Sequence, residues 1–202
     1  MANNKNNIHP IFDSVLSRND KEKKLKQKAK VLWLTGLSGS GKSTIAIGLE
    51  QELHKNGYFC KLLDGDNIRM GINNNLGFSD DDRTENIRRI AEISKLFIDC
   101  GVITINSFVS PTRFIRQLAS NIIGDNDFIE VYVNVSLKEA EARDVKGLYK
   151  KARSGEIKNF TGVDSPFEPP EFPNIILNTE EQTIDESVNE LYNFIIDQIK
   201  LQ

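Results

Sequence analysis

Hydrophobic residues along the chain gather into five short runs, and longer segments with helical spacing separate most of them. The runs are "KVLWLTG" (30–36), "YFCKLLDGD" (58–66), "VITINSF" (102–108), "FIEVYVNV" (128–135) and "NIILNT" (174–179). Short apolar runs of this kind predict buried strands. Strands that alternate with helices form a mainly parallel sheet, and its ligands bind beyond the carboxyl ends of the strands. We therefore expect an α/β protein with its chemistry directly after each strand.

The first run leads directly into "GLSGSGKST" (36–44), and a helix candidate follows it. The stretch fits the phosphate-loop pattern G-x-x-x-x-G-K-S/T. The alternative is a simple Gly/Ser-rich turn, which would require neither the strand before it nor the helix after it. In such a loop, backbone N–H groups converge on phosphate oxygens, Lys42 reaches the β and γ oxygens, and Ser43 ligates Mg²⁺. We expect a three-layer P-loop fold that uses ATP as co-substrate with Mg²⁺. The predicted ATP-binding residues of the loop are Gly36, Leu37, Ser38, Gly39, Ser40, Gly41, Lys42, Ser43 and Thr44.

The second run ends in "LLDGDNIR", which brings Asp64 and Asp66 to the same edge of the sheet as the phosphate loop. Alternate residues of an extended strand point to one side, so both carboxylates are predicted to face one site. Two acids with Arg69 beside a nucleotide loop favour metal and hydroxyl chemistry. A tight Asx turn without a catalytic role is the alternative.

The segment 79–101 predicts an amphipathic helix. Its apolar face consists of Ile87, Ile90, Ala91, Ser94, Phe97 and Ile98. This face extends back by one turn to Arg83 and Asn86, which we therefore place on the buried side of the helix start. Arg83 is predicted to face an anion, and an ion pair with Asp64 or Asp66 is the alternative.

One long connection, 146–173, mixes a short basic helix with Gly and Pro residues. Connections of this length inside compact domains are usually lids or disordered linkers. Basic residues beside Phe160 favour a lid over phosphates; they are Lys146, Lys150, Lys151 and Arg153. We expect two parts in the chain: a solvated, lysine-rich N-terminal arm (1–28) and a P-loop domain (29–202).

Composition narrows the range of partners. The 202 residues carry a net charge of -3, so nucleic acid is not an expected partner. Every apolar run is shorter than the roughly 18 residues that a membrane-spanning helix needs. The first residues lack the hydrophobic centre of a signal peptide. We expect a cytoplasmic protein without a membrane partner. Cys60 and Cys100 have no metal or redox spacing and are predicted to be buried thiols, and His9 has no predicted catalytic role.

Six blocks of the sequence, in order, resemble adenylylsulfate kinases. The blocks are "GLSGSGKST", "LDGDNIR", "LGFSDDDRTENIRRI", "SFVSP", "RDVKGLYKKAR" and "FTGVDSPFEPP". A P-loop alone defines only a superfamily, whereas six such blocks between about residues 28 and 180 are far more specific. The resemblance implies transfer of the ATP γ-phosphoryl group to the 3′-hydroxyl of adenosine 5′-phosphosulfate (APS). The product, 3′-phosphoadenosine 5′-phosphosulfate (PAPS), belongs to sulfate assimilation, and a homodimer is common in this family.

The resemblance also implies roles for individual residues. The substrate-binding residues would be Asp66, Arg69, Phe78, Arg83, Asn86, Ser110, Lys146, Leu148 and Phe160. The two phenylalanines would stack on the adenine of APS. Arg143 would serve the ATP side, and the metal would be held by Ser43 and Asp66. The implied catalytic residues are Ser110, Asp66, Lys42 and Asp64, the last in a supporting role.

Ser110 matches a serine that has been described in this family as a phosphoserine intermediate. A serine nucleophile wants an adjacent base that a third group orients, and no histidine lies near Ser110 in the sequence. Direct in-line transfer needs only an aligned donor and acceptor. We therefore expect a Ser110→Ala variant to retain measurable turnover.

Two other functions fit parts of the sequence. The first is a P-loop kinase for another small metabolite, such as a polyol, a nucleoside or a shikimate-like acid. The second is a non-catalytic regulatory module that binds PAPS or a nucleotide. Intact Lys42, Ser43 and Asp66 argue against the second function.

Overall fold

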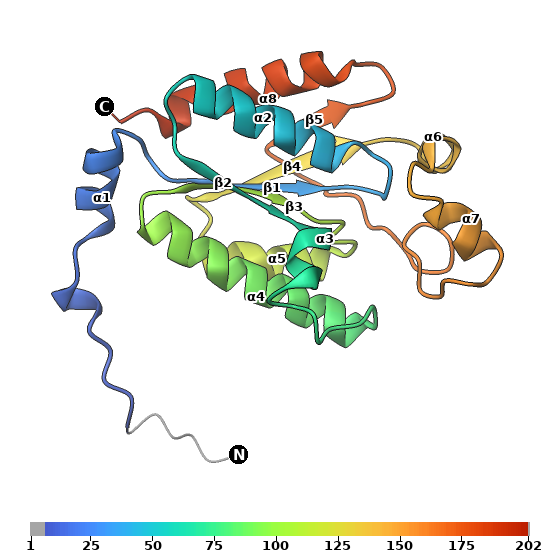
Figure 1. The fold of residues 1–202 in the computed structure, drawn as a ribbon, viewed down its shortest axis with the longest axis horizontal. Coiled ribbons are helices and arrows are strands. Elements are labelled where there is room, and N and C mark those ends of the chain that lie inside the picture. Colours follow the sequence, from blue (N-terminus) through green and yellow to red (C-terminus); the bar gives the residue numbers. More distant parts are fainter. Residues whose placement is uncertain (1–6, 202) are drawn as a thin grey trace.

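A computed structural model describes residues 7–201 of the chain. Each predicted run contains a strand in the structure. The strands are β1 (Val31–Thr35), β2 (Cys60–Asp64), β3 (Ile103–Ser107), β4 (Phe128–Asn134) and β5 (Ile175–Asn178). They form one parallel sheet in the order β2-β3-β1-β4-β5, so β1 lies at its centre (Figure 1). The predicted α/β class with a five-stranded parallel sheet is confirmed, and every strand pair in the described chain is parallel.

Helices cover both faces of this sheet (Figure 1). They are α2 (Lys42–Lys55) and α8 (Ile184–Ile199) on one face and α4 (Asp80–Asp99) and α5 (Arg113–Ile123) on the other. Side chains of β1 alternate between the two layers: Leu32 and Leu34 pack toward the first, and Val31 and Trp33 toward the second. Each such side chain stabilises the fold by roughly 1.5–3 kcal/mol on burial. The carboxyl end of β1 is thereby held rigidly between two cores.

Three short helices lie beyond the carboxyl ends of the strands. They are α3 (Gly65–Met70), α6 (Leu137–Arg143) and α7 (Leu148–Arg153). The predicted lid contains α7 and the long loop that returns to β5, and it projects from one end of the sheet (Figure 1). The lid packs through its own small core, in which Tyr149 is buried against Phe160.

The structure corrects the prediction for the second strand. Asp66 lies in the first turn of α3 and not on an extended strand, so the alternation argument was wrong. The reason is a helix cap: the Asp64 carboxylate accepts the backbone N–H of Asp66 at 3.1 Å. The Asx turn that we gave as the alternative is therefore present.

Two further expectations are wrong. Cys60 is only half-buried and Cys100 is exposed, because the latter caps the carboxyl end of α4 beyond its apolar stripe. The lysine-rich arm (1–28) is not wholly solvated, since Glu22 and Gln27 are buried. It contains a 3₁₀ turn, η2 (Phe12–Ser14), and the helix α1 (Arg18–Leu25). The first six residues of the predicted arm and Gln202 lie outside the described residues.

Within residues 7–201, no helix combines the length and the apolar character needed to cross a bilayer.

Candidate active site

The phosphate loop connects β1 to the start of α2. Gly36 has φ +151°, and a Cβ atom there would meet the carbonyl oxygen of Val133 at 2.4 Å, so only glycine fits. Gly41 caps α2 with φ +96°, in the left-handed region that favours glycine. Beyond this cap, the first N–H groups of α2 have no partners within their own helix. These two glycines therefore shape a cradle for an anion at the amino end of α2.

Lys42 is the buried cation of this loop, and its side chain is only 8% exposed. Its ammonium donates to the carbonyl oxygens of Gly36 at 3.0 Å and Leu37 at 2.7 Å. Burial lowers the pKa of Lys42 to about 7, and the nearby carboxylates of Asp64 and Asp66 act in the opposite direction. A phosphate oxygen beside the ammonium would favour the charged form. The geometry therefore favours polyphosphate binding.

Asp64 connects the phosphate loop with the rest of the site. The Ser43 hydroxyl donates to one oxygen of the Asp64 carboxylate at 2.7 Å, and the other oxygen caps α3. The hydroxyl of Ser107, at the carboxyl end of β3, lies 3.2 Å from the Ser43 hydroxyl. Such hard oxygen atoms are the ligands that Mg²⁺ prefers. Sequence reasoning did not single out Ser107, although its place at a strand end was a usable signal.

A cluster of two arginines and one phenylalanine lies beyond β2. The Arg69 guanidinium carbon is 4.4 Å and that of Arg83 is 5.8 Å from the centre of the Phe78 ring. Burial lowers the pKa of both arginines, and the charge of Arg83 lowers that of Arg69 further. Two cations held on one exposed ring are chemically suited to an anion attached to an aromatic base.

Arg83 also ties this cluster to the lid. It donates to the carbonyl oxygen of Asn159 at 2.6 Å and to the hydroxyl of Thr161 at 3.3 Å. In the described chain it forms no ion pair with Asp64 or Asp66, so the alternative that we considered is wrong.

Asn86 and Asp66 have different surroundings, although both were predicted at the site. Asn86 is 5% exposed, which confirms its place on the buried side of α4, and its side chain accepts the amide of Asn73 at 2.9 Å. It therefore holds the loop that leads to Phe78. Asp66 is open to solvent and forms an ion pair with Lys146 of the lid. The Asp66 carboxylate therefore contacts the lid, and its charge also acts on Lys42 of the phosphate loop.

The basic residues of the lid do not all face phosphates. Lys151 pairs with Glu156 at 3.3 Å and Arg153 with Glu141 at 2.9 Å, and Lys150 is exposed. The phase of α7 explains this result, because its buried side carries Tyr149 and Ala152 and its charged residues point outward. Of the predicted basic cluster, only Lys146 reaches the site.

Tyr149 and Thr179, which sequence reasoning missed, join the phosphate loop to neighbouring segments. The Tyr149 hydroxyl donates to the carbonyl oxygen of Ser38 at 2.9 Å, and the Thr179 hydroxyl donates to that of Ser40 at 3.0 Å. Arg143, predicted for the ATP side, donates to the carbonyl oxygen of Thr179 at 2.7 Å. Leu148, beside Tyr149 in α7, is partly buried. The position of Thr179, directly after β5, was the available sequence signal.

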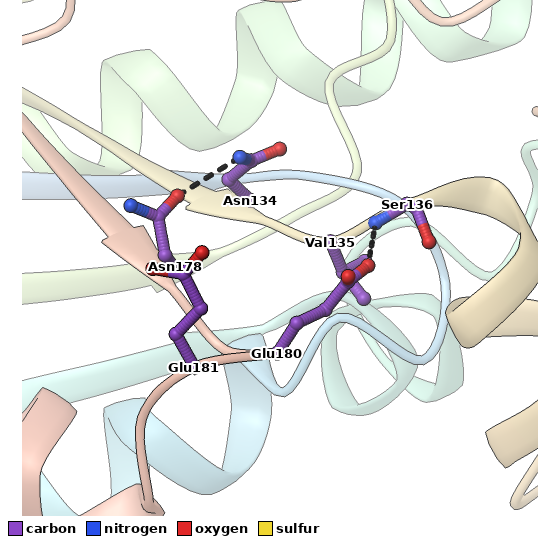
Figure 2. A pocket seen from close by; sticks show the side chains of 6 residues that line it. All are labelled: Asn134, Val135, Ser136, Asn178, Glu180 and Glu181. Atoms are coloured by element: carbon purple, nitrogen blue, oxygen red, sulfur yellow. Dashed lines mark hydrogen bonds between the residues drawn. The ribbon is translucent and has the colours of Figure 1, made fainter.

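A small cavity of about 210 Å³ lies at the ends of β4 and β5, beside Thr179. Its lining is Asn134, Val135, Ser136, Asn178, Glu180 and Glu181. Figure 2 shows the amide of Asn134 turned toward Asn178 and the Glu180 carboxylate turned toward the backbone of Ser136. Its two carboxylates make it unsuitable for phosphate, so the phosphate site remains the open loop.

Ser110 lies just after β3, but its surroundings do not activate it. The side chain is 2% exposed, and its Oγ accepts the indole N–H of Trp33 at 2.9 Å. None of the hydrogen bonds found for its hydroxyl in the described chain involves a histidine or a carboxylate. The backbone has φ +44°, a rare conformation for a residue with a side chain. Ser110 thus occupies the structural position of a buried turn residue.

Comparison with known proteins gives consistent matches. The family model described as "Adenylylsulphate kinase" matches residues 28–178. A protein of Phocaeicola vulgatus named adenylyl-sulfate kinase is 64% identical over 190 residues, 94% of this chain and 93% of its own length. One of the same name from Bacteroides fragilis is 61% identical over 96% of both chains. A solved Mycobacterium tuberculosis APS kinase in complex with AMPPNP and APS superposes with a TM-score of 0.81 at 43% identity, covering 84% of this chain and 98% of that one.

Proposed function

The chain belongs to the adenylylsulphate kinase family, and we propose that it transfers the γ-phosphoryl group of ATP to the 3′-hydroxyl of APS. The products are PAPS and ADP, as in sulfate assimilation. One observation carries the proposal. One oxygen of the Asp64 carboxylate accepts the Ser43 hydroxyl of the phosphate loop, and the other caps α3, the helix that carries Arg69. We call Arg69, Phe78 and Arg83 the anion-binding cluster. A donor site and an acceptor site therefore meet at one carboxylate.

The chain's own residues can perform an in-line transfer. The acceptor hydroxyl oxygen forms a bond to the γ-phosphorus while the bond to the bridging β–γ oxygen breaks. We assign the hydroxyl proton to the Asp66 carboxylate, and the charge that grows on the leaving oxygens to Lys42 and the amino end of α2. Arg69 and Arg83 hold the phosphosulfate, and Phe78 and Phe160 hold the adenine.

Mg²⁺ fits the oxygen atoms near the phosphate loop. We propose that Ser43 holds it with carboxylates at Asp64 and Asp66, where Mg²⁺ typically takes one or two carboxylates plus the substrate phosphates. Among the described residues, no group of three or more His, Cys, Asp and Glu side chains is placed to hold a metal ion. When bound, the ion neutralises charge on the β and γ oxygens.

An acceptor panel tests the proposed function. Purified protein with Mg²⁺ and ATP is incubated with APS, with gluconate, with shikimate and with adenosine, and ATP consumption is followed for each acceptor. We expect rapid consumption with APS only. Consumption with another acceptor would favour a different small-metabolite kinase, and binding of PAPS without turnover would favour a regulatory module.

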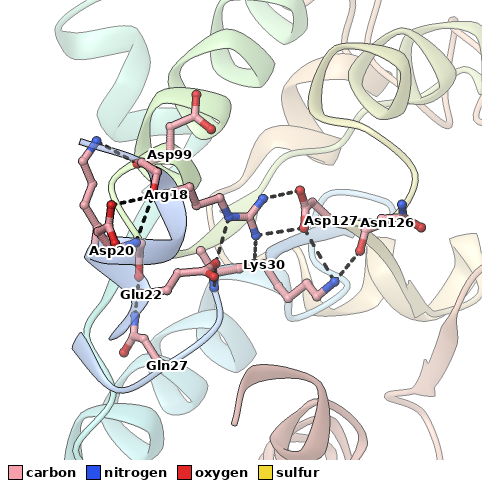
Figure 3. A network of polar contacts seen from close by, with 12 residues as sticks. Arg18, Asp20, Glu22, Gln27, Lys30, Asp99, Asn126 and Asp127 are labelled. Carbon is pink, nitrogen blue, oxygen red and sulfur yellow. Dashed lines mark hydrogen bonds and ion pairs between the residues drawn. The ribbon is translucent and has the colours of Figure 1, made fainter. Parts of the chain in front are cut away.

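We propose that the protein forms a homodimer and that its N-terminal segment takes part. Figure 3 shows how α1 is fixed to the domain: the Arg18 guanidinium donates to Asp127 at 2.9 Å. It also donates to the carbonyl of Ala29 at 2.6 Å. Before α1, a series of large apolar side chains is exposed, namely Ile8, Ile11, Phe12, Val15 and Leu16. Exposed apolar surface of this kind typically marks an interaction site. Light scattering should give twice the mass of one chain, and less after Phe12→Ser.

We also place the reaction in the cytoplasm. Cys60 and Cys100 are both free thiols, which persist in reducing compartments.

A further inference from the structure

Arg116, on α5, is a buried cation for which the reaction outlined above has no role. Its side chain is 4% exposed, and its Nε lies 2.8 Å from a carboxylate oxygen of Glu130 on β4. Burial lowers the pKa of Arg116 and raises that of Glu130, while the attraction between the two charges acts the other way on each. A buried ion pair is rarely the most stable choice for a core position, so a specific task for this pair is worth seeking.

The other two guanidinium nitrogens bind backbone carbonyls from two separate segments. Nη1 donates to the carbonyl of Ser110 at 2.8 Å, and Nη2 donates to that of Glu168 at 2.7 Å. Ser110 belongs to the turn after β3, and Glu168 belongs to the part of the lid that returns to β5. One planar group thus joins this turn, the lid and β4, which the fixed fork of an arginine can do and a lysine cannot.

The turn and the lid are also joined directly. The backbone N–H of Glu168 donates to the carbonyl of Pro111 at 2.8 Å, and its carboxylate accepts the backbone N–H of Arg113 at 2.8 Å. The left-handed backbone of Ser110 is uncommon, and such conformations persist only where the surroundings hold them. Arg116 supplies one of the contacts that hold it.

We propose that Arg116 is a positioning residue for the acceptor, because it fixes the Ser110 turn and the returning lid segment in one geometry. This inference rests on the proposed function. The lid loop that ends in this segment carries Phe160 and Thr161, and Thr161 contacts Arg83 of the anion-binding cluster. A shift of the segment would therefore displace the acceptor.

Most polar contacts that hold the phosphate loop do not involve Arg116; the Thr35 hydroxyl, one residue before the loop, donates to the carbonyl of Ser110 at 3.3 Å. Tyr149 and Thr179 bind the carbonyl oxygens of the loop, and neither forms a hydrogen bond to Arg116 in the described chain. Loss of Arg116 should therefore affect APS and leave ATP almost unchanged. A residue with a purely structural role would not separate the two substrates in this way.

The decisive variant combines Arg116→Met with Glu130→Leu. It removes both charges at similar volume, and such replacements of buried pairs are often neutral or stabilising, so the fold should persist. Arg116→Lys is a milder second variant. It keeps the positive charge but loses the planar guanidinium that donates to three partners at once. Gln117→Ala is the matched control on the same helix, because its exposed side chain hydrogen-bonds only to Asn121 of the same helix in the described chain.

Steady-state kinetics give the readout, with each KM measured at saturating co-substrate and folding checked by circular dichroism. We expect the double variant to raise the KM for APS about tenfold and to keep the KM for ATP within about twofold, because small misplacements of a substrate cost this much or more. Arg116→Lys should show a smaller rise, and Gln117→Ala none. An unchanged KM for APS, or equal changes for both substrates, in a folded variant would overturn the inference. Failure of the wild-type protein to form PAPS would instead overturn the proposed function.

Discussion

The nucleotide half and the acceptor half of the site are built in different ways. The proposed nucleotide half is one continuous stretch, residues 36–44, which combines backbone groups with the buried Lys42. The acceptor half combines side chains from α3, α4 and the lid, and its Phe78 ring is 59% exposed. Local geometry determines the first half, whereas tertiary packing assembles the second. Changes in the first should therefore impair transfer itself, and changes in the second should impair APS binding.

The largest effect is expected for Lys42→Ala. The ammonium stabilises charge that grows on the β and γ oxygens, and loss of one such contact typically costs about 10² to 10³ in rate. The measurement is kcat/KM for ATP. Lys55→Ala is the control on the same helix, because that side chain is 77% exposed. Activity of the Lys42 variant within about threefold of wild type would refute the assignment of the phosphate loop.

Asp66→Asn should have the next largest effect. It removes the charge that accepts the hydroxyl proton, so turnover should fall by about 10², whereas ATP affinity should fall far less because Ser43 and Asp64 still hold the metal. Asp64→Asn is the matched comparison, and it should weaken ATP binding as well because Asp64 contacts Ser43. Both are measured as turnover beside a direct titration with ATP. If Asp66→Asn keeps normal turnover, Asp66 is only a first-turn residue of α3.

Phe78→Ala should weaken APS binding and spare ATP. Stacking of a base on an aromatic ring contributes roughly 1 to 3 kcal/mol by alanine substitution. Phe59→Ala is a control with a similar exposed fraction, 60%, outside the acceptor cluster. Calorimetric titration with each ligand separates the two halves. Equal losses for APS and ATP would mean that Phe78 does not belong to the acceptor half.

The smallest effect is expected where the two halves meet, at Tyr149. Burial raises the pKa of its hydroxyl from 10.0 to about 12. The folded protein therefore holds this proton more tightly than the unfolded chain, so this stabilisation is complete below about pH 10 and is lost as the pH rises toward 12. Tyr149→Phe should cost about 0.5–1.5 kcal/mol at pH 8 through the lost hydrogen bond to Ser38. Urea unfolding at increasing pH should show a shallower decline for the variant, and parallel declines would contradict the assignment.

The same contrast explains what the sequence could predict. The strands and the phosphate loop depend on contiguous patterns, and β3 lies within one residue of the predicted run at each end. The predicted strand alternation of Asp64 and Asp66 was wrong because strand extension and an Asx cap compete at "DGD", and the cap prevails. Arg69 and Phe78 lie nine residues apart, and only the loop between them brings them together.

Other features carry no local signal at all. Arg116 lies in none of the quoted motifs, and the block "RDVKGLYKKAR" indicates no role for its Tyr149; the importance of both arises from partners such as Glu168 and Ser38, which are distant in the sequence. The outward direction of Lys151 follows from the phase of α7, which a six-residue helix does not reveal in advance. Tertiary packing decides these positions.

The most direct test of the account is the identity of the product. The protein is mixed with Mg²⁺, ATP and APS, and phosphorus NMR with mass spectrometry identifies the nucleotide that forms. The account predicts one new phosphomonoester on the 3′-oxygen of an intact adenosine 5′-phosphosulfate, formed in equal amount to ADP. A phosphoryl group at another position, or release of ADP with inorganic phosphate and unchanged APS, would contradict it.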